Sequence, residues 1–304
     1  MSIVLALLLD HWWGEPPARI HPVVWMGYYL KRVGRNLPDR APVPAFVLGM
    51  AYWLAGAAAV ALLYGVAAHE IGKLPGWLAS IITAVLLKPL FALRMLIDEV
   101  RAVEDALAGG VERGRARLAR IVSRDTSRLD EAQVRESALE SLSENLSDSV
   151  IAPLFWFAFF GLAGVAVYRF ANTADAMWGY RGRWEWAGKF AAHADDVLNW
   201  LPARVTAFGL LWLGPRGFAL TRSLPSEAKR TPSPNSGWPM AALALSLNVK
   251  LCKPGVYGLN DAGRTVGAQD TPVALKRAQT CAWVIAGILA IGVQYLMGWP
   301  HASP

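Results

Sequence analysis

Charged side chains and cysteines are both scarce in this sequence. Asp, Glu, Lys and Arg make up 17% of the 304 residues, whereas hydrophobic residues make up 54% and tryptophan occurs 14 times. This composition is more apolar than that of most soluble domains and indicates an integral membrane protein. The two cysteines, Cys252 and Cys281, lie far apart and form neither a metal-binding spacing nor a CxxC motif. No disulfide scaffold is therefore expected.

Familiar nucleotide and metal motifs are also missing. No segment matches the GxxxxGK[ST] phosphate loop, the GxGxxG dinucleotide pattern or the HExxH metal motif. Any nucleotide must therefore bind outside those folds. The net charge of +7 does not indicate a nucleic-acid partner. The basic residues fall mostly in connecting segments, where the positive-inside bias and anionic lipid head groups account for them.

Long uncharged runs predict an all-α, polytopic membrane protein with four or five transmembrane helices. The run 45–68 carries no charge and would form a helix of roughly 36 Å, enough to cross a hydrocarbon core of about 30 Å. The runs 150–168 and 281–298 are the next candidates. The run 77–97 is interrupted by two basic residues and a proline, and the run 205–220 is short, so both could be kinked or only partly inserted.

The N-terminal segment "MSIVLALLLD" has eight apolar residues and no basic n-region. It is too short to cross a bilayer and lacks a cleavage site, so we expect neither a signal peptide nor a full helix there.

Two polar segments separate the apolar runs. In the first, a polar insert at about 98–148, apolar residues recur at helical spacing and predict two or three amphipathic helices. Glycines near 109–114 predict a turn, and Ser and Asp near 123–130 predict helix caps. The second, at about 222–278, contains "SLPSEAKRTPSPNSGWP", which is too rich in Pro, Ser and Gly for a regular element and predicts a polar loop.

The segment "ESALESLSENLSDSV" places Glu136, Glu140, Glu144 and Asp148 four residues apart. On a helix these like charges form a drifting stripe and repel each other by a few tenths of a kcal/mol per pair. One alternative is that arginines of the stretch 113–128 fold back and neutralise them. The other is a divalent cation held by Glu140, Glu144 or Asp148, because carboxylates suit Mg²⁺. Acids at a bilayer boundary are costly without a partner, which favours the second alternative.

Two more polar patterns could contribute to a site. In "HADDVLNWLPAR", Asp195, Asp196 and Asn199 place a carboxylate and an amide on one helical face; such a pair could share a cation or orient a phosphate-bound metal. Asn172 and Asp175 upstream could belong to a site or form a simple helix cap, while His193 is a base or merely a surface histidine. The turn "SPNSGWP" could cradle an anion with its backbone N–H groups, or be only a turn.

Several of these motifs occur together in one order. They are "LLLDHWWGEP" and "HPVVWMG", then "SRDTSRLDEAQVRESALESLSENLSD", "YRFANTADAMWGYRGRW", "HADDVLNWLPAR" and "SPNSGWPMAALA". Over roughly residues 5–260 the chain resembles the adenosylcobinamide-phosphate synthase family, the membrane-bound cobalamin-biosynthesis ligases called CbiB or CobD. A membrane signalling or sensor protein of β-lactamase induction shares parts of the pattern and is the alternative.

The resemblance implies an ATP- and Mg²⁺-dependent ligase in a single membrane-embedded catalytic domain over residues 1–304. Such an enzyme joins (R)-1-amino-2-propanol, or its O-phosphate, to a propionate carboxylate of the corrinoid adenosylcobyric acid. It would lie in the cytoplasmic membrane of the cell, in contact with the lipid bilayer and with its active site facing the cytoplasm. Homo-oligomers, or association with later cobalamin-assembly enzymes, would fit this role.

The resemblance also implies roles for individual residues. The catalytic group would be Glu140, Glu144, Asp148, Asp195 and Asp196, of which Glu144, Asp148 and Asp196 would bind metal. Substrate or nucleotide would be bound by Arg124, Asp125, Asn145, Asn172, Asp175, Tyr180, Asn199, Arg204, Ser233, Asn235 and Gly237. The family pattern YKxxNTLDSM differs from this chain at Arg169, Ala174 and Ala176. We expect these differences to affect the detail of substrate binding.

Topology constrains this assignment. If the run 150–168 crosses the membrane fully, the acidic segment and the segment 172–204 lie on opposite sides, and one active site cannot use both. Either the run is a re-entrant or hairpin element, or the segment 172–204 dips back into the membrane.

Overall fold

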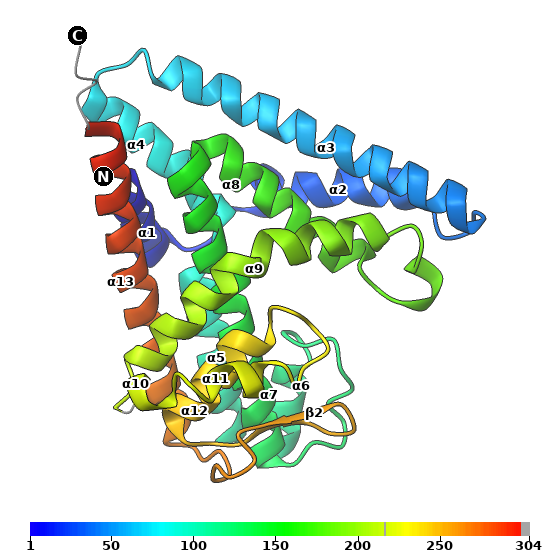
Figure 1. Cartoon of the computed structure of the whole chain (residues 1–304), viewed down its shortest axis with the longest axis vertical. Helices are drawn as coiled ribbons and strands as arrows, with labels where there is room; N and C mark the ends of the chain where they lie inside the picture. Colours follow the sequence, from blue (N-terminus) through cyan, green and yellow to red (C-terminus); the bar gives the residue numbers. More distant parts are fainter. Residues whose placement is uncertain (216, 299–304) are drawn as a thin grey trace. The chain divides into compact units, whose positions relative to one another are not determined.

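The computed structural model describes residues 1–215 and 217–298 and is almost entirely helical (Figure 1). Its α-helices are α1 (Ser2–Trp13), α2 (Pro22–Gly34), α3 (Pro42–Ile71), α4 (Gly76–Leu87), α5 (Leu93–Leu107), α6 (Val111–Leu118), α7 (Glu131–Leu146), α8 (Ala152–Trp178), α9 (Lys189–Trp212), α10 (Gly217–Leu220), α11 (Leu224–Ala228), α12 (Gly237–Leu247) and α13 (Asp270–Gly298). The strands are β1 (Leu251–Lys253) and β2 (Tyr257–Leu259). The prediction of a helical fold is confirmed.

The chain forms two compact units. The first contains residues 1–92, residues 152–198 and the chain from residue 286 onward, and the second contains residues 93–151 and 199–285. The single catalytic domain expected over residues 1–304 stays a prediction.

In the first unit, α3 and α2 pack against α8, and α1 packs against α4. Close approach of α3 and α8 depends on Gly56, where an added Cβ would lie 2.2 Å from the ring of Phe170. The Trp53 ring meets Phe170 and Phe190 edge to face, with centroids 6.0 and 5.1 Å apart. Small residues and interlocking rings of this kind are how helices pack in apolar surroundings.

In the second unit, α5, α6 and α7 pack together, and α12 packs against α7. The buried side chains of α5 recur every three or four residues, as in Ile97, Val100, Val103 and Leu107. Asp130 caps α7 through a capping box with Gln133, a motif in which the cap alone is worth about 1 kcal/mol. The predicted amphipathic helices and the cap near 123–130 are confirmed, but the glycine turn is shorter than expected because α6 already begins at Val111.

The segment 222–278 is more ordered than its composition predicts. It contains α11, α12 and an antiparallel hairpin in which Leu251 of β1 faces Leu259 of β2. Proline and glycine occupy the first turns of the two helices, at Pro225 and Gly237. A first turn tolerates proline because its N–H has no helical partner there. The strands have three residues each, too few for a visible alternation.

Four helical stretches of the described chain are long and apolar enough to cross a membrane: Pro42–Ile71, Gly76–Leu107, Glu131–Trp178 and Asp270–Gly292. These stretches contain or overlap four of the five runs that the sequence predicts as membrane spans: 45–68, 77–97, 150–168 and 281–298. The fifth candidate, 205–220, is not among them, because α9 ends at Trp212 and α10 begins at Gly217. Helix α1 has 12 residues, which is too short to span a bilayer.

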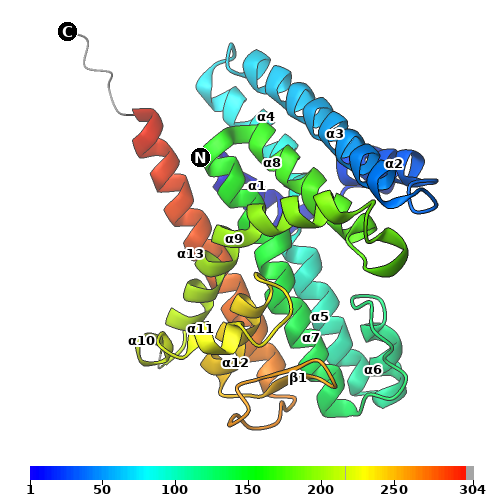
Figure 2. The same ribbon diagram turned by 45° about the vertical axis from the view of Figure 1, so that its right-hand side comes forward.

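Helix α8 is broken near its middle. Phe160 (φ −131°, ψ 15°) and Gly161 (φ 61°, ψ −154°) leave the helical region, and α8 changes direction in Figures 1 and 2. The apolar run 150–168 is therefore not one straight helix. A break within this run is what the re-entrant or hairpin alternative requires. The backbone of Gly161 lies in a region that is essentially restricted to glycine.

We expect Gly161→Ala to destabilise the protein by about 1–3 kcal/mol through backbone strain alone, because an added Cβ at this position meets no atom within 4 Å. The matched control is Gly65→Ala in the regular helix α3, where an added Cβ also meets nothing within 4 Å. There alanine should be neutral or stabilising by up to about 1 kcal/mol. Unfolding in mixed SDS micelles measures both variants. If the two variants were equally stable, alanine at position 161 would cause no backbone strain, and the prediction would be wrong.

Candidate functional site

A buried ion pair lies at the centre of the second unit. The carboxylate of Glu140 on α7 is almost completely enclosed, and its Oε2 accepts a hydrogen bond of 2.6 Å from Nη2 of Arg124. Arg124 comes from the loop between α6 and α7 and also donates to Ser137 Oγ at 3.1 Å. Burial alone would lower the pKa of Arg124, but the charge of Glu140 reverses the shift and raises it. The guanidinium therefore stays charged.

The second oxygen of Glu140 is different. Among the described residues, Oε1 is buried without a hydrogen-bond partner. Tyr257 on β2 faces the same region, and its hydroxyl contacts Met240 Sδ at 3.7 Å. Burial raises the pKa of Tyr257, and the charge of Glu140 together with a side-chain hydrogen bond to it raises the pKa further, so the phenol stays protonated and is a donor beside Glu140. The site thus combines a carboxylate oxygen that has spare acceptor capacity, a fixed cation and a neutral donor.

The acids of α7 do not form the uniform stripe that the spacing predicts. Glu136 is buried and accepts a 3.1 Å hydrogen bond from the backbone N–H of Cys252. Glu144 is half-buried, and Asp148 lies in a π-helical turn, Ser147–Ile151. A π turn holds about one more residue than an α turn, so the regular α-helical register of the four acids is not continued through Asp148. Such turns occur frequently at functional sites.

Arginine neutralises Glu140 in this group. Arg124 pairs with Glu140, but Arg115 and Arg117 pair with Glu112 and Glu99, away from α7. Glu140 therefore follows the ion-pair alternative.

Two predicted residues near this pair have local roles. Asp125 is exposed, accepts from the N–H of Ser127 at 2.9 Å, and has its pKa lowered by that bond. Asn145 donates to Ser141 O at 3.0 Å within α7 and accepts from Ser149 Oγ at 3.4 Å. Both geometries are those of local turns and helices, and a role in nucleotide binding stays a prediction for each.

Arg204 and Asn235 are brought together, as the sequence predicts. The guanidinium lies between the rings of Trp200 and Trp238, 4.4 and 4.6 Å from their centroids. It donates to Asn235 Oδ1 at 2.9 Å and to Pro234 O at 3.2 Å. Arg204 therefore fixes the loop before α12.

The rest of that loop is tightly held. Ser233 Oγ accepts from the N–H groups of Asn235 and Ser236, both at 3.2 Å. A Cβ at Gly237 would lie 2.2 Å from the carbonyl oxygen of Ala228, so glycine is required by close packing. Two N–H groups that the anion-cradle alternative would use are already bonded to Ser233.

A second polar group lies in the first unit. Asn172 of α8 donates to Asp195 Oδ1 of α9 at 3.4 Å and accepts from Arg169 at 3.1 Å. Asn172 and Asp175 lie inside α8, so the helix-cap alternative is wrong. Burial raises the pKa of Asp196, partly opposed by His193.

The remaining predicted residues differ in exposure. Tyr180 follows α8 and is 56% exposed, whereas Asn199 on α9 is buried. In the described part of the chain no three His, Cys, Asp or Glu side chains form a group that could hold a metal ion. Metal binding by Glu144, Asp148 and Asp196 stays a prediction.

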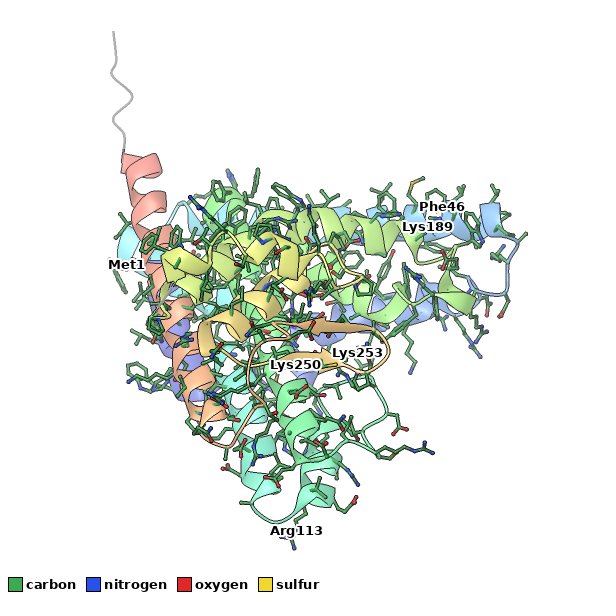
Figure 3. The ribbon with its side chains drawn as sticks, turned by 60° about the horizontal axis from the view of Figure 1, so that its bottom comes forward. Met1, Phe46, Arg113, Lys189, Lys250 and Lys253 are labelled. Atoms are coloured by element: carbon green, nitrogen blue, oxygen red, sulfur yellow. The ribbon has the colours of Figure 1, made fainter. Side chains whose placement is uncertain are left out.

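Some residues of this region could not be selected from the sequence. Tyr257 belongs to a hairpin whose only sequence signal is the Pro254–Gly255 turn, and Trp200 and Trp238 are two of 14 tryptophans. Lys250 precedes β1 and Lys253 is its last residue (Figure 3), and Lys250 pairs with Asp261 at 3.0 Å.

Comparison with known proteins gives the family. Residues 3–285 match the family model described as CobD/Cbib protein. This chain belongs to the CobD/CbiB family. It is 44% identical to the cobalamin biosynthesis protein CobD of Chromobacterium violaceum, over 99% of each chain. It is 40% identical to the probable CobD proteins of Pyrococcus furiosus, over 94% of each chain, and Methanothermobacter thermautotrophicus, over 85% of this chain and 86% of the other. No solved structure matches.

The match confirms the resemblance and identifies this CobD-family chain as a cobalamin biosynthesis protein with candidate transmembrane helices. The matched range, residues 3–285, includes both the Arg124–Glu140 pair and the Asn172–Asp195 pair.

We expect Arg204→Lys to loosen the loop 233–237, because an ammonium cannot stack between two indoles while bonding Asn235 and Pro234. Loss of these contacts should raise amide hydrogen exchange in the loop by about tenfold, the equivalent of about 1.4 kcal/mol. The control is Arg113→Lys, since Arg113 points outward from α6 (Figure 3). Unchanged exchange in Arg204→Lys would mean that the stack does not hold the loop.

Proposed function

We propose that this CobD-family protein is an ATP-dependent amide ligase. It joins (R)-1-amino-2-propanol, or its O-phosphate, to a propionate carboxylate of adenosylcobyric acid in the cytoplasmic membrane, on the cytoplasmic side. The observation that supports it best is the buried Glu140 carboxylate, which is held by Arg124 through one oxygen and lies beside the hydroxyl of Tyr257. An enclosed carboxylate with unused acceptor capacity beside a fixed cation fits a ligand-binding centre better than a purely structural ion pair.

The donor set fits magnesium. Mg²⁺ takes oxygen ligands and is usually held by one or two carboxylates together with substrate phosphates. Glu140 Oε1 has no partner in the described residues, and Glu144 and Asp148 follow on α7 and the π turn. Glu144 and Asp148 are the proposed ligands. The ion would supply charge neutralisation for the phosphates.

The reaction requires activation, because a carboxylate does not condense with an amine in water. In the proposed route a carboxylate oxygen of the corrinoid attacks the γ-phosphorus of ATP, and ADP leaves. The amine then attacks the acyl phosphate, and inorganic phosphate leaves as the amide forms. Arg124 would steady the transferred phosphoryl group, since positioning and charge neutralisation govern this chemistry.

The polar group on α8 and α9 is assigned to substrate binding. Asn172 presents amide groups and Asp195 a carboxylate, and carboxylates and amides suit the amine and the side-chain amides of a corrinoid. The loop at Ser233, Asn235 and Gly237 is assigned to the same substrate, with Arg204 as its positioning residue.

Glu144→Gln and Asp148→Asn should each lower ligation turnover by at least about 100-fold, because an amide keeps the shape of the side chain but removes the charge that a cation needs. The matched control is Glu112→Gln, since Glu112 is 79% exposed on α6. Turnover is measured with adenosylcobyric acid, amine, ATP and Mg²⁺ in nanodiscs, and folding by elution and thermal unfolding. Near-normal turnover with normal Mg²⁺ dependence would place the site elsewhere.

The route of activation can be followed with isotopes. Cobyric acid carrying ¹⁸O in the reacting propionate should transfer one labelled oxygen to inorganic phosphate, while ADP accumulates in step with amide. Both are measured by mass spectrometry. Label in AMP would refute the acyl-phosphate route and leave the ligase assignment intact. Amide formation without label transfer would contradict carboxylate activation itself.

A further inference from the structure

The first unit contains a cavity that the proposed reaction does not use. It has a volume of about 490 Å³ and is enclosed by the N-terminal motif "WGEPP", α2 and the end of α4. Its walls are mostly apolar and include the aromatic rings of Trp13, Trp25 and Tyr64. A volume in this range is typical of a site for a small organic ligand.

One end of the cavity is charged. Lys88, whose side chain is only 8% exposed, places its Nζ 2.8 Å from Glu15 Oε1 and 3.2 Å from Asp10 Oδ1. Glu15 Oε2 lies 3.0 Å from His21 Nε2. Burial alone would raise the pKa of Glu15, but the bonds from His21 and Lys88 lower it below its ordinary value. Glu15 and Lys88 therefore present opposite charges side by side.

This end has capacity for a ligand. An ammonium group has three N–H donors; Lys88 donates one to Glu15 Oε1 and faces Asp10 Oδ1 at the ion-pair distance of 3.2 Å, which leaves donor capacity for a ligand. A buried donor that lacks an acceptor is costly. Lys88 set against Glu15 and Asp10 leaves one net negative charge, which disfavours an anionic ligand and favours one that also carries a cation.

The other end of the cavity continues along α3. A second cavity of about 200 Å³ shares Pro22, Trp25 and Tyr64 with the first. It runs between α2 and α3 and is lined further on by Ala59 and Leu63. Helix α3 is one of the candidate membrane spans, and Leu63 is 65% exposed. The pair of cavities thus leads from a charged end to a helix face suited to hydrocarbon.

We propose that the two cavities bind one zwitterionic, ammonium-headed phospholipid. Its phosphate accepts an N–H of Lys88, and its ammonium lies against Glu15 and the rings of Trp13 and Trp25. One acyl chain follows the second cavity along α3. Aromatic faces and a carboxylate suit an ammonium, and burial of each CH₂ group adds to binding. A soluble aminoalkyl phosphate shares the head-group chemistry but leaves the apolar cavity unfilled.

Binding can be measured on the purified full chain by native mass spectrometry in a neutral detergent. Phosphatidylethanolamine and phosphatidylglycerol with the same acyl chains are added separately over the same concentration range. We expect one phosphatidylethanolamine per chain at a concentration about tenfold or more below that for phosphatidylglycerol. Ala59→Trp fills the second cavity and should weaken this binding by about tenfold or more. Leu62→Trp is the control, because Leu62 is on the same helix, 69% exposed, and lines neither cavity.

Three results would overturn the proposal. Equal retention of the two lipids would remove the head-group argument, and unchanged binding in Ala59→Trp would remove the cavity along α3. Displacement of phosphatidylethanolamine by O-phosphoethanolamine at equal concentration would assign the charged end to a soluble ligand in place of a lipid.

Discussion

A charged side chain in apolar surroundings is stable only when a partner of opposite charge accompanies it. Each ion loses several kcal/mol of hydration on burial, and removal of one partner typically costs about 3–5 kcal/mol. Arg124 and Glu140 satisfy this requirement in the second unit, as do Arg135 and Glu104. Each pair joins separate elements: the first holds the loop before α7 onto that helix, and the second holds α7 to α5. The buried charges therefore determine the positions of the helices that surround the proposed centre.

The same pairing explains how a structural and a functional role can share one carboxylate. Glu140 uses Oε2 to hold Arg124, while Oε1 is buried without a partner in the described residues. A purely structural pair would leave an unsatisfied acceptor at a cost of about 1–3 kcal/mol. Binding of a cation or donor removes that cost. The ion-pair and the cation alternatives for the acids are thus compatible, because Glu140 holds the arginine while Glu144 and Asp148 are the proposed cation ligands.

Features that depend on composition and local spacing could be predicted from the sequence. The uncharged run 45–68 lies within α3, and Asp130 caps α7. The helical spacing of apolar residues predicted the helices of the insert at 98–148. The motif residues Asn172 and Asp195, and likewise Arg204 and Asn235, proved to be neighbours. Features set by tertiary contacts could not be predicted. A three-residue strand has no readable period, so Tyr257 was missed, and nothing local distinguishes the non-helical Gly161 from the helical Gly164 in "FFGLAG".

Two backbone irregularities accompany the change from polar to apolar sequence after α7. The π turn Ser147–Ile151 lies between the polar residues of α7 and the apolar start of α8, and the break at Phe160 and Gly161 follows within α8. In hydrocarbon, a helix can leave its regular path only where its freed backbone groups find other partners. A π turn alters the helical register at Asp148 without ending the helix, because its backbone hydrogen bonds close one residue later than those of an α turn. Asp148 thereby leaves the α-helical register of Glu136, Glu140 and Glu144 at the point where the polar sequence changes to the apolar segment.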